Sequence, residues 1–276
     1  MNQKFEKSQK LEKWLRWMDA IHNEVLALVA DANIFWEVQD LIRENPRIQK
    51  PNAFYSYLAR TYLSHALVGL RRQTKLQKDS ISFVRLLDEI AKNPEELSRS
   101  YFNSCHPHSN GPDLDQVVGK ANLEAVGIAD ASQLKAIIKM DDFAQYADAS
   151  GMYVCPQMVK DDQARLESAV KTYEEFADKR IAHWDKREPK VVPTFGELDD
   201  CIKLLDQTYV KYHFLFHAES IDTLMPTYQY EWKSIFCEPW LKVGFGSAKG
   251  LIHVSEDFDD ELPDFKEYTD SPSRSV

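Results

Sequence analysis

The sequence predicts an all-α protein that folds as a helical bundle. Apolar residues recur at three- and four-residue spacing over several long segments, as in helices that bury one face. Prolines and capping residues separate these segments, and strands do not alternate with helices along the chain. A chain of 276 residues, 43% of them hydrophobic, has enough apolar surface to build one large domain.

The first helical pattern covers residues 9–43 and ends before Pro46, because proline is excluded from helix interiors. Asp31 and Asn33 lie within this pattern. Both residue types compete for backbone hydrogen bonds and favour caps, so they predict a break or kink in the first helix.

Three further helices are predicted in the first hundred residues. One covers residues 52–75, one follows a cap at Asp79 or Ser80, and a short one begins at Pro94. The side of the second helix that is expected to face the core carries Phe54, Leu58, Tyr62, Ala66, Gly69 and Leu70.

The middle of the chain has a different character. Loop-forming residues begin at Ser104, and we expect an inserted subdomain of short helices and irregular connections over about 104–160. A helical pattern resumes at Asp161 and extends to Trp184. The whole helical domain, with this insertion, is expected to cover residues 1–255.

Another long helix is predicted after Thr194. Thr194 and Glu197 have the spacing of a capping box, in which each side chain bonds the other residue's backbone N–H. The aromatic segment that follows this helix, residues 228–240, is interpreted as part of the core.

Acidic residues are concentrated at the C-terminus. Residues 256–276 contain eight acids and two bases, which gives −6 of the net charge of −10 and leaves −4 for the first 255 residues. Such a segment has little to bury, so we expect a mobile acidic tail. Because it also carries aromatic residues, it can compete with RNA for a basic groove; the alternative is a tail that only aids solubility.

Composition also narrows the location of the protein. No apolar run approaches the roughly 20 residues of a membrane-spanning helix, and no signal-peptide core follows Met1. The four cysteines (Cys105, Cys155, Cys201 and Cys237) are far apart and are expected to be reduced thiols. We therefore expect a cytoplasmic protein without a membrane partner.

Arg180 and His183 are the candidate catalytic residues. In an α-helix this spacing places a permanent cation and a group that titrates near neutrality on one face, one turn apart. Cleaving RNA without a metal needs a base for the 2′-hydroxyl and a cation for the charge that develops on the phosphate. His183 can be the base and Arg180 the cation, with Lys179 and Arg187 as candidate RNA-binding residues. A helix-end histidine and a surface ion pair explain the same residues without catalysis.

The segment Asp178–His183, followed by a loop and a capped helix, resembles the HEPN superfamily (higher eukaryotes and prokaryotes nucleotide-binding), and within it the AbiU-like abortive-infection branch. Three more stretches are similar to that branch: residues 67–74, 80–87 and 226–232. The resemblance implies a HEPN-type helical bundle, a composite site across a homodimer, and a metal-independent ribonuclease of bacterial antiphage defence. It implies no cofactor and no metal, and it suggests an antitoxin protein as a further partner.

The chain departs from the HEPN motif, which is an arginine, four to six residues, and then histidine. Here Arg180 is only three residues before His183, and the next arginine upstream is Arg165. Either Arg180 replaces the missing arginine, or the protein is an inert module that binds a nucleotide, RNA or a protein partner.

Other candidates for chemistry are interpreted as structural. Cys105, His106 and His108 do not have the spacing of a zinc site. His213 and His217 lack the glutamate of a HExxH motif, so they are interpreted as a packing or surface pair. The glycine-rich residues 244–250 lack the ending of a phosphate-binding loop and are interpreted as a turn.

Overall fold

The computed structural model describes residues 7–105, 142–182, 186, 188 and 191–236. The chain divides into two compact units, Met1–Pro226 and Thr227–Val276. The described residues are mostly helical and contain no strand, only the isolated bridges Ser98–Tyr153 and Ala147–Val154. The all-α prediction is thus confirmed for this part of the chain. Most of the expected insertion, residues 106–141, lies outside the described residues, as does the acidic tail.

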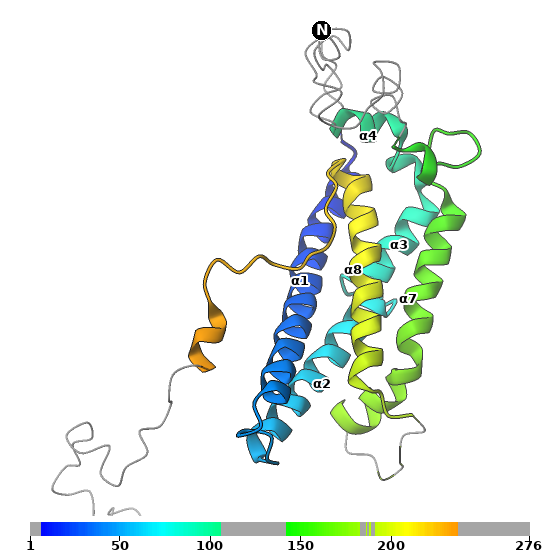
Figure 1. Cartoon of the computed structure of the whole chain (residues 1–276). Helices are drawn as coiled ribbons and strands as arrows, with labels where there is room; N and C mark the ends of the chain where they lie inside the picture. The colour runs from blue at the N-terminus through cyan, green and yellow to red at the C-terminus, as the bar shows by residue number, and fades with distance from the viewer. Residues whose placement is uncertain (1–6, 106–141, 183–185, 187, 189–190, 237–276) are drawn as a thin grey trace, which may run out of the picture. The chain divides into compact units, whose positions relative to one another are not determined.

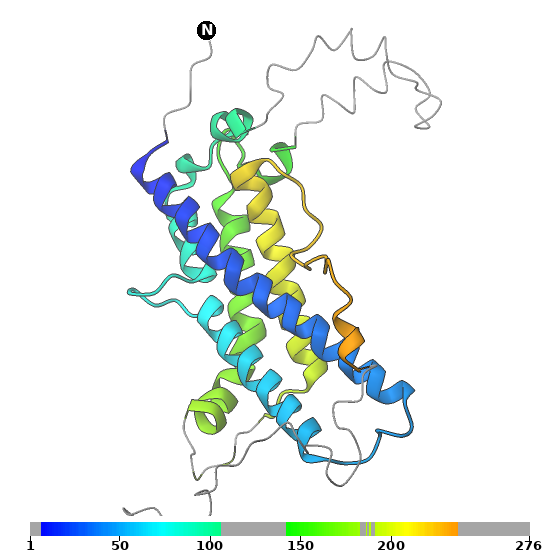
Figure 2. The same ribbon diagram turned by 90° about the vertical axis from the view of Figure 1, so that its left-hand side faces the viewer.

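The first unit is a bundle of long helices (Figure 1). Its long elements are α1 (Gln9–Glu44), α2 (Ala53–Thr74), α3 (Phe83–Lys92), α7 (Pro156–Phe176) and α8 (Phe195–His217). Helix α1 packs on α2 and α8, while α3 packs on α7. Short elements complete it: η1 (Pro94–Glu96), α4 (Arg99–Cys105), η3 (Ala144–Tyr146) and η4 (Ala177–Ala182). The loop that joins α2 to α3 projects from the side of the unit (Figure 2).

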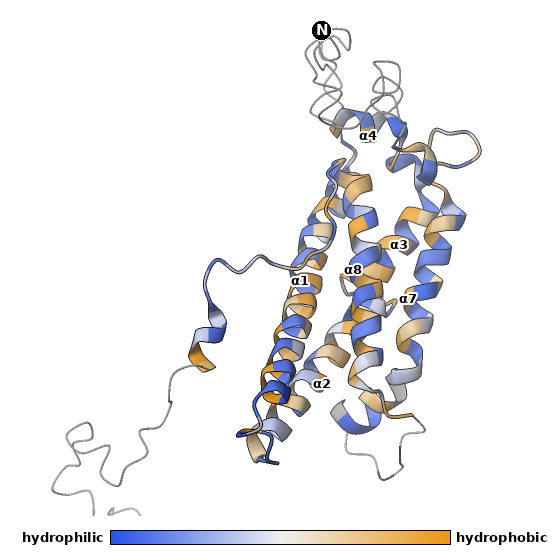
Figure 3. Cartoon of the chain, in the orientation of Figure 1, coloured by the Kyte–Doolittle hydropathy of each residue, from blue (hydrophilic) through white to orange (hydrophobic). Residues whose placement is uncertain are grey.

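Apolar and polar residues alternate around the turns of α1, α7 and α8, as expected for helices with one buried face (Figure 3). Trp14, Met18 and Val25 of α1 are fully buried. No helix in the described ranges is both long and apolar enough to cross a bilayer.

Helix α1 continues without a break through Asp31 and Asn33, so the predicted kink is wrong. Both side chains find partners that leave the backbone ladder intact. The amide of Asn33 donates to the Oε1 atom of Glu37 at 3.1 Å, one turn further along the helix. Asp31 pairs with His65 of α2 at 3.1 Å. Local competition for the backbone is therefore removed by contacts that propensity alone does not reveal.

The helix starts differ partly from those predicted. Ser82, and not Asp79 or Ser80, caps α3: its hydroxyl accepts from the N–H of Arg85 at 3.3 Å. Helix α7 begins at Pro156, earlier than Asp161. The capping box that opens α8 is confirmed, since Thr194 and Glu197 bond each other's backbone N–H groups.

One residue and one segment that were predicted to belong to the core are exposed or lie outside it. Phe54 is 48% exposed, whereas Tyr62, Gly69 and Leu70 are buried as expected. The prediction that the aromatic segment belongs to the core is also wrong for its described residues. Residues 228–236 belong to the second unit, with the short helix η5 (Trp232–Phe236), and Tyr230 is exposed.

Gly69 permits a close approach of α2 to α1. A Cβ atom at this position would lie 2.6 Å from Cδ2 of Leu28, and Leu28 is itself buried. Interiors are too closely packed to accommodate such an overlap unless the Leu28 side chain shifts.

We expect Gly69→Val to lower the free energy of unfolding by about 1–3 kcal/mol through overpacking. Chemical denaturation measures this. The matched control is Gly196→Val, because a Cβ at Gly196 meets no atom within 4 Å. Adding Leu28→Ala to Gly69→Val should recover part of the loss. If Gly69→Val and Gly196→Val lower the free energy of unfolding equally, overpacking between α1 and α2 is not the cause.

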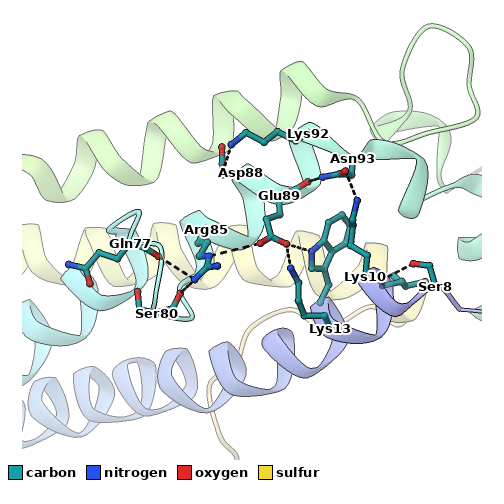
Figure 4. A network of polar contacts seen from close by, with 12 residues as sticks. Ser8, Lys10, Lys13, Gln77, Ser80, Arg85, Asp88, Glu89, Lys92 and Asn93 are labelled. Atoms are coloured by element: carbon teal, nitrogen blue, oxygen red, sulfur yellow. Dashed lines mark hydrogen bonds and ion pairs between the residues drawn. The ribbon is translucent and has the colours of Figure 1, made fainter.

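A polar network joins the start of α1 to α3 (Figure 4). Glu89 is its centre: its Oε2 accepts from Trp14 Nε1 at 2.8 Å and pairs with Lys13, while Arg85 lies 4.0 Å from Oε1. Burial acts to raise the pKa of Glu89, but the hydrogen bonds from Lys13 and Trp14 and the charges of Lys13 and Arg85 together lower it. The folded state therefore favours the carboxylate.

A lowered pKa means that Glu89 stabilises the fold above the ordinary glutamate pKa, and that this contribution disappears as the pH falls through the folded-state value. We expect Glu89→Gln to cost about 1–2 kcal/mol at neutral pH, with the gap from the parent closing in acid. Thermal unfolding against pH tests this. Asp88→Asn is the control, because its pair with Lys92 is exposed and should contribute under about 1 kcal/mol. A stability difference between the parent and Glu89→Gln that does not change with pH would contradict the lowered pKa of Glu89.

Candidate functional site

The segment that carries Lys179 and Arg180 is a π-helical turn, η4, which directly follows α7. Such turns are rare and are frequent at functional sites. A π turn holds more residues than an α turn, and η4 ends at Ala182. The prediction that Arg180 and His183 share one helical face therefore stays a prediction. His183 itself lies outside the described residues, as does Arg187.

Glu188 contacts both described cations of the predicted site. Its carboxylate pairs with the Arg180 guanidinium, and its carbonyl oxygen accepts from Lys179 Nζ at 3.2 Å. The side chain of Arg180 is only 17% exposed, whereas that of Glu188 is 85% exposed. A phosphate that binds Arg180 therefore competes with this carboxylate.

An ion pair also joins η4 to α2. Asp178 pairs with the guanidinium of Arg71, in the last turn of α2. The neighbouring Arg72 pairs with Glu24 of α1 at 2.8 Å. Basic residues of α2 thus lie beside the turn that carries Lys179 and Arg180.

A cleft of about 520 Å³ opens between the end of α2, the following loop and η4. Three of its lining residues are cations, and none is acidic. The lining consists of Val68, Arg71, Arg72, Lys75, Gln77, Ser80, Ile81 and Ala177. Ala177 is the first residue of η4. The cleft therefore brings a basic surface to the turn that carries Lys179 and Arg180.

Sequence reasoning assigned no role to Arg71, Arg72 or Lys75. Their spacing over one turn at a helix C-terminus was a usable signal. It was not distinctive, however, because basic residues in a last turn also stabilise the helix dipole. The cleft becomes visible only when residues 68–81 and residue 177 are brought together by folding.

His213 and His217 are other candidates that lie within the described residues. The rings of His213 and His217 lie 4.7 Å apart, and burial lowers the pKa of His217, with a further lowering from His213. Across the described ranges, no three His, Cys, Asp or Glu side chains are grouped so that they could hold a metal ion. His106, His108 and residues 244–250 lie outside the described residues.

Comparison with known proteins gives no match for this chain: no family model, no curated protein and no solved structure is similar enough to count. The HEPN resemblance therefore stays a prediction that rests on the quoted residues.

Proposed function

We propose that the protein is a bacterial defence or toxin-like protein of HEPN type that binds RNA at the cleft between α2 and η4. One observation carries the proposal: Arg71, Arg72 and Lys75 line a cleft whose wall includes the π turn that bears Lys179 and Arg180. Phosphates are the ligands that such a gathering of arginine and lysine recognises best. Lys179 and Arg187 extend the basic surface in this proposal.

The proposed reaction is cleavage of RNA without a metal. His183 removes the proton of a 2′-hydroxyl, the 2′-oxygen attacks the adjacent phosphorus, and the bond to the 5′-oxygen breaks. Arg180 stabilises the charge that develops on the phosphate oxygens. In a homodimer, the second copy of the site offers a proton donor for the leaving 5′-oxygen.

The alternative is an inert module that binds RNA, a nucleotide or a protein. Two observations favour it. The arginine–histidine spacing is shorter than in the HEPN motif, and Arg180 is largely covered and paired with Glu188. The two functions share the basic cleft and differ in whether bound RNA is cut.

If the protein cleaves RNA, His183→Ala should reduce the rate by about 10²–10⁴-fold, the usual contribution of a general base. Its RNA affinity and melting temperature should not change. Single-turnover cleavage of a labelled RNA with a chelator present measures this. The control is His213→Ala, because His213 lies on α8 and has no part in the proposed mechanism.

The outcomes separate the hypotheses. Activity that a chelator abolishes and magnesium restores overturns the metal-free mechanism. Full activity in His183→Ala removes that residue from the mechanism. Binding without cleavage by the parent protein supports the inert alternative.

A composite site requires two copies of the chain. We expect a homodimer that forms through the end of the helix bearing Lys179 and Arg180 and through α8. Sedimentation at micromolar protein should show one species of twice the chain mass of 32.0 kDa. A monomer under conditions where RNA is still cut would show that one copy suffices.

A further inference from the structure

We propose that the α2–η4 cleft is a site for one nucleotide unit, with the phosphate on Arg72 and Lys75 and the base between Val68 and Ile81. This inference deepens the proposed function and rests on it, because RNA is the expected source of the nucleotide. Free nucleotide has the same chemistry and is the other source. The cleft's volume of about 520 Å³ lies within the usual range for small-ligand sites, about 300–1,000 Å³.

The cationic end of the cleft can accept a phosphate without a large rearrangement. The Arg72 side chain is 59% exposed, and its contact with Glu24 occupies one terminal nitrogen. Lys75 forms no ion pair with any residue that the structure describes. A guanidinium and an ammonium one turn apart can bind one phosphate together, the first through paired N–H donors and the second as a point charge.

The site lies at a helix C-terminus, where the helix dipole disfavours an anion. Several carbonyl groups that create this effect are already bonded. The carbonyl of Leu70 accepts from Thr74 Oγ1 at 2.8 Å, and that of Arg71 accepts from the Lys75 N–H at 3.1 Å. Ser82 Oγ donates to the Lys75 carbonyl at 3.0 Å. The three side-chain cations therefore outweigh the remaining partial charge.

The other walls suit a base. Val68 is 41% exposed and Ile81 46% exposed, although both are aliphatic and line one cleft. Arg85 fixes the loop between them by donating to the Gln77 and Ser80 carbonyls (Figure 4). The Gln77 amide and the Ser80 hydroxyl make no side-chain hydrogen bond to a described residue. They are thus available to bond the edge of a base that lies against the aliphatic walls.

Asp178 is a built-in competitor for this site. Its carboxylate pairs with Arg71, a lining residue, and is half exposed. The carboxylate neutralises Arg71 and repels a phosphate that binds the neighbouring Arg72 and Lys75. Removing the negative charge at residue 178 should therefore increase affinity, a gain that misfolding cannot produce.

The test measures binding of adenosine monophosphate, inorganic phosphate and a short single-stranded RNA to the full chain by titration calorimetry. The variant Arg72→Ala/Lys75→Ala should weaken nucleotide and RNA binding by about tenfold or more, and Asp178→Asn should tighten both by about two- to fivefold. The control Lys203→Ala removes one charge from an exposed pair with Asp199 on α8 and should change neither. Circular dichroism confirms that each variant folds.

The probes separate the sources of the ligand and the parts of the proposal. Binding of both monophosphate and RNA supports a nucleotide site, and binding of RNA alone supports a subsite for one unit of the strand. If inorganic phosphate binds as tightly as the monophosphate, Val68 and Ile81 contribute nothing and the base site is overturned. Unchanged binding in Arg72→Ala/Lys75→Ala overturns the whole inference.

The inference and the proposed function can fail separately. If His183→Ala or Arg180→Ala stops cleavage while nucleotide affinity stays unchanged, both stand. Nucleotide binding in a protein that cuts no RNA supports this site alone. Cleavage that continues with an unchanged KM in Arg72→Ala/Lys75→Ala supports the proposed function and removes this cleft from it.

Discussion

The rest of the structure depends on the burial of one face of α1. A helix of 36 residues is about 54 Å long, and ten of its side chains, from Leu11 to Val38, are buried. Helices α2, α3 and α8 all contact it. An uninterrupted α1 therefore sets the distances between the elements that surround it. At Gly69, the side chain of Leu28 of α1 fills the space that a Cβ atom on α2 would need.

This arrangement explains where the candidate site lies. The end of α2 is held on one side by its packing on α1 and on the other by the ion pair between Arg71 and Asp178 of η4. The loop after α2 is fixed by Ser82 and Arg85. Three elements from separate parts of the sequence thus enclose one basic cleft. Arg72 and Lys75 take no part in the ion pair that joins α2 to η4, so they can exchange partners while that pair stays intact.

Periodicity predicted the helices because one-sided burial leaves a regular trace in the sequence. Residue propensity failed at Asp31 and Asn33, whose polar side chains are satisfied by His65 and Glu37 respectively. Periodicity failed at Phe54, which lies on the predicted core face of α2 but is 48% exposed. The site could be predicted only in part. The basic character of residues 179–180 is local, but the partner Glu188 and the approach of Arg71 are tertiary contacts that spacing does not encode.

The net charge of the chain limits how it can bind a nucleic acid. A chain with a net charge of −10 repels RNA at long range, so any attraction must be local. Salt at physiological strength screens exposed charges beyond about 8 Å. Within that distance the cleft presents Arg71, Arg72 and Lys75, opposed by Asp178 and Glu24, which leaves a small excess of positive charge. A site with so narrow an excess binds one phosphate better than a long strand, and its affinity depends on which carboxylates are displaced. The acidic partners thereby determine selectivity, because a ligand must bond the cations better than Asp178 and Glu24 do.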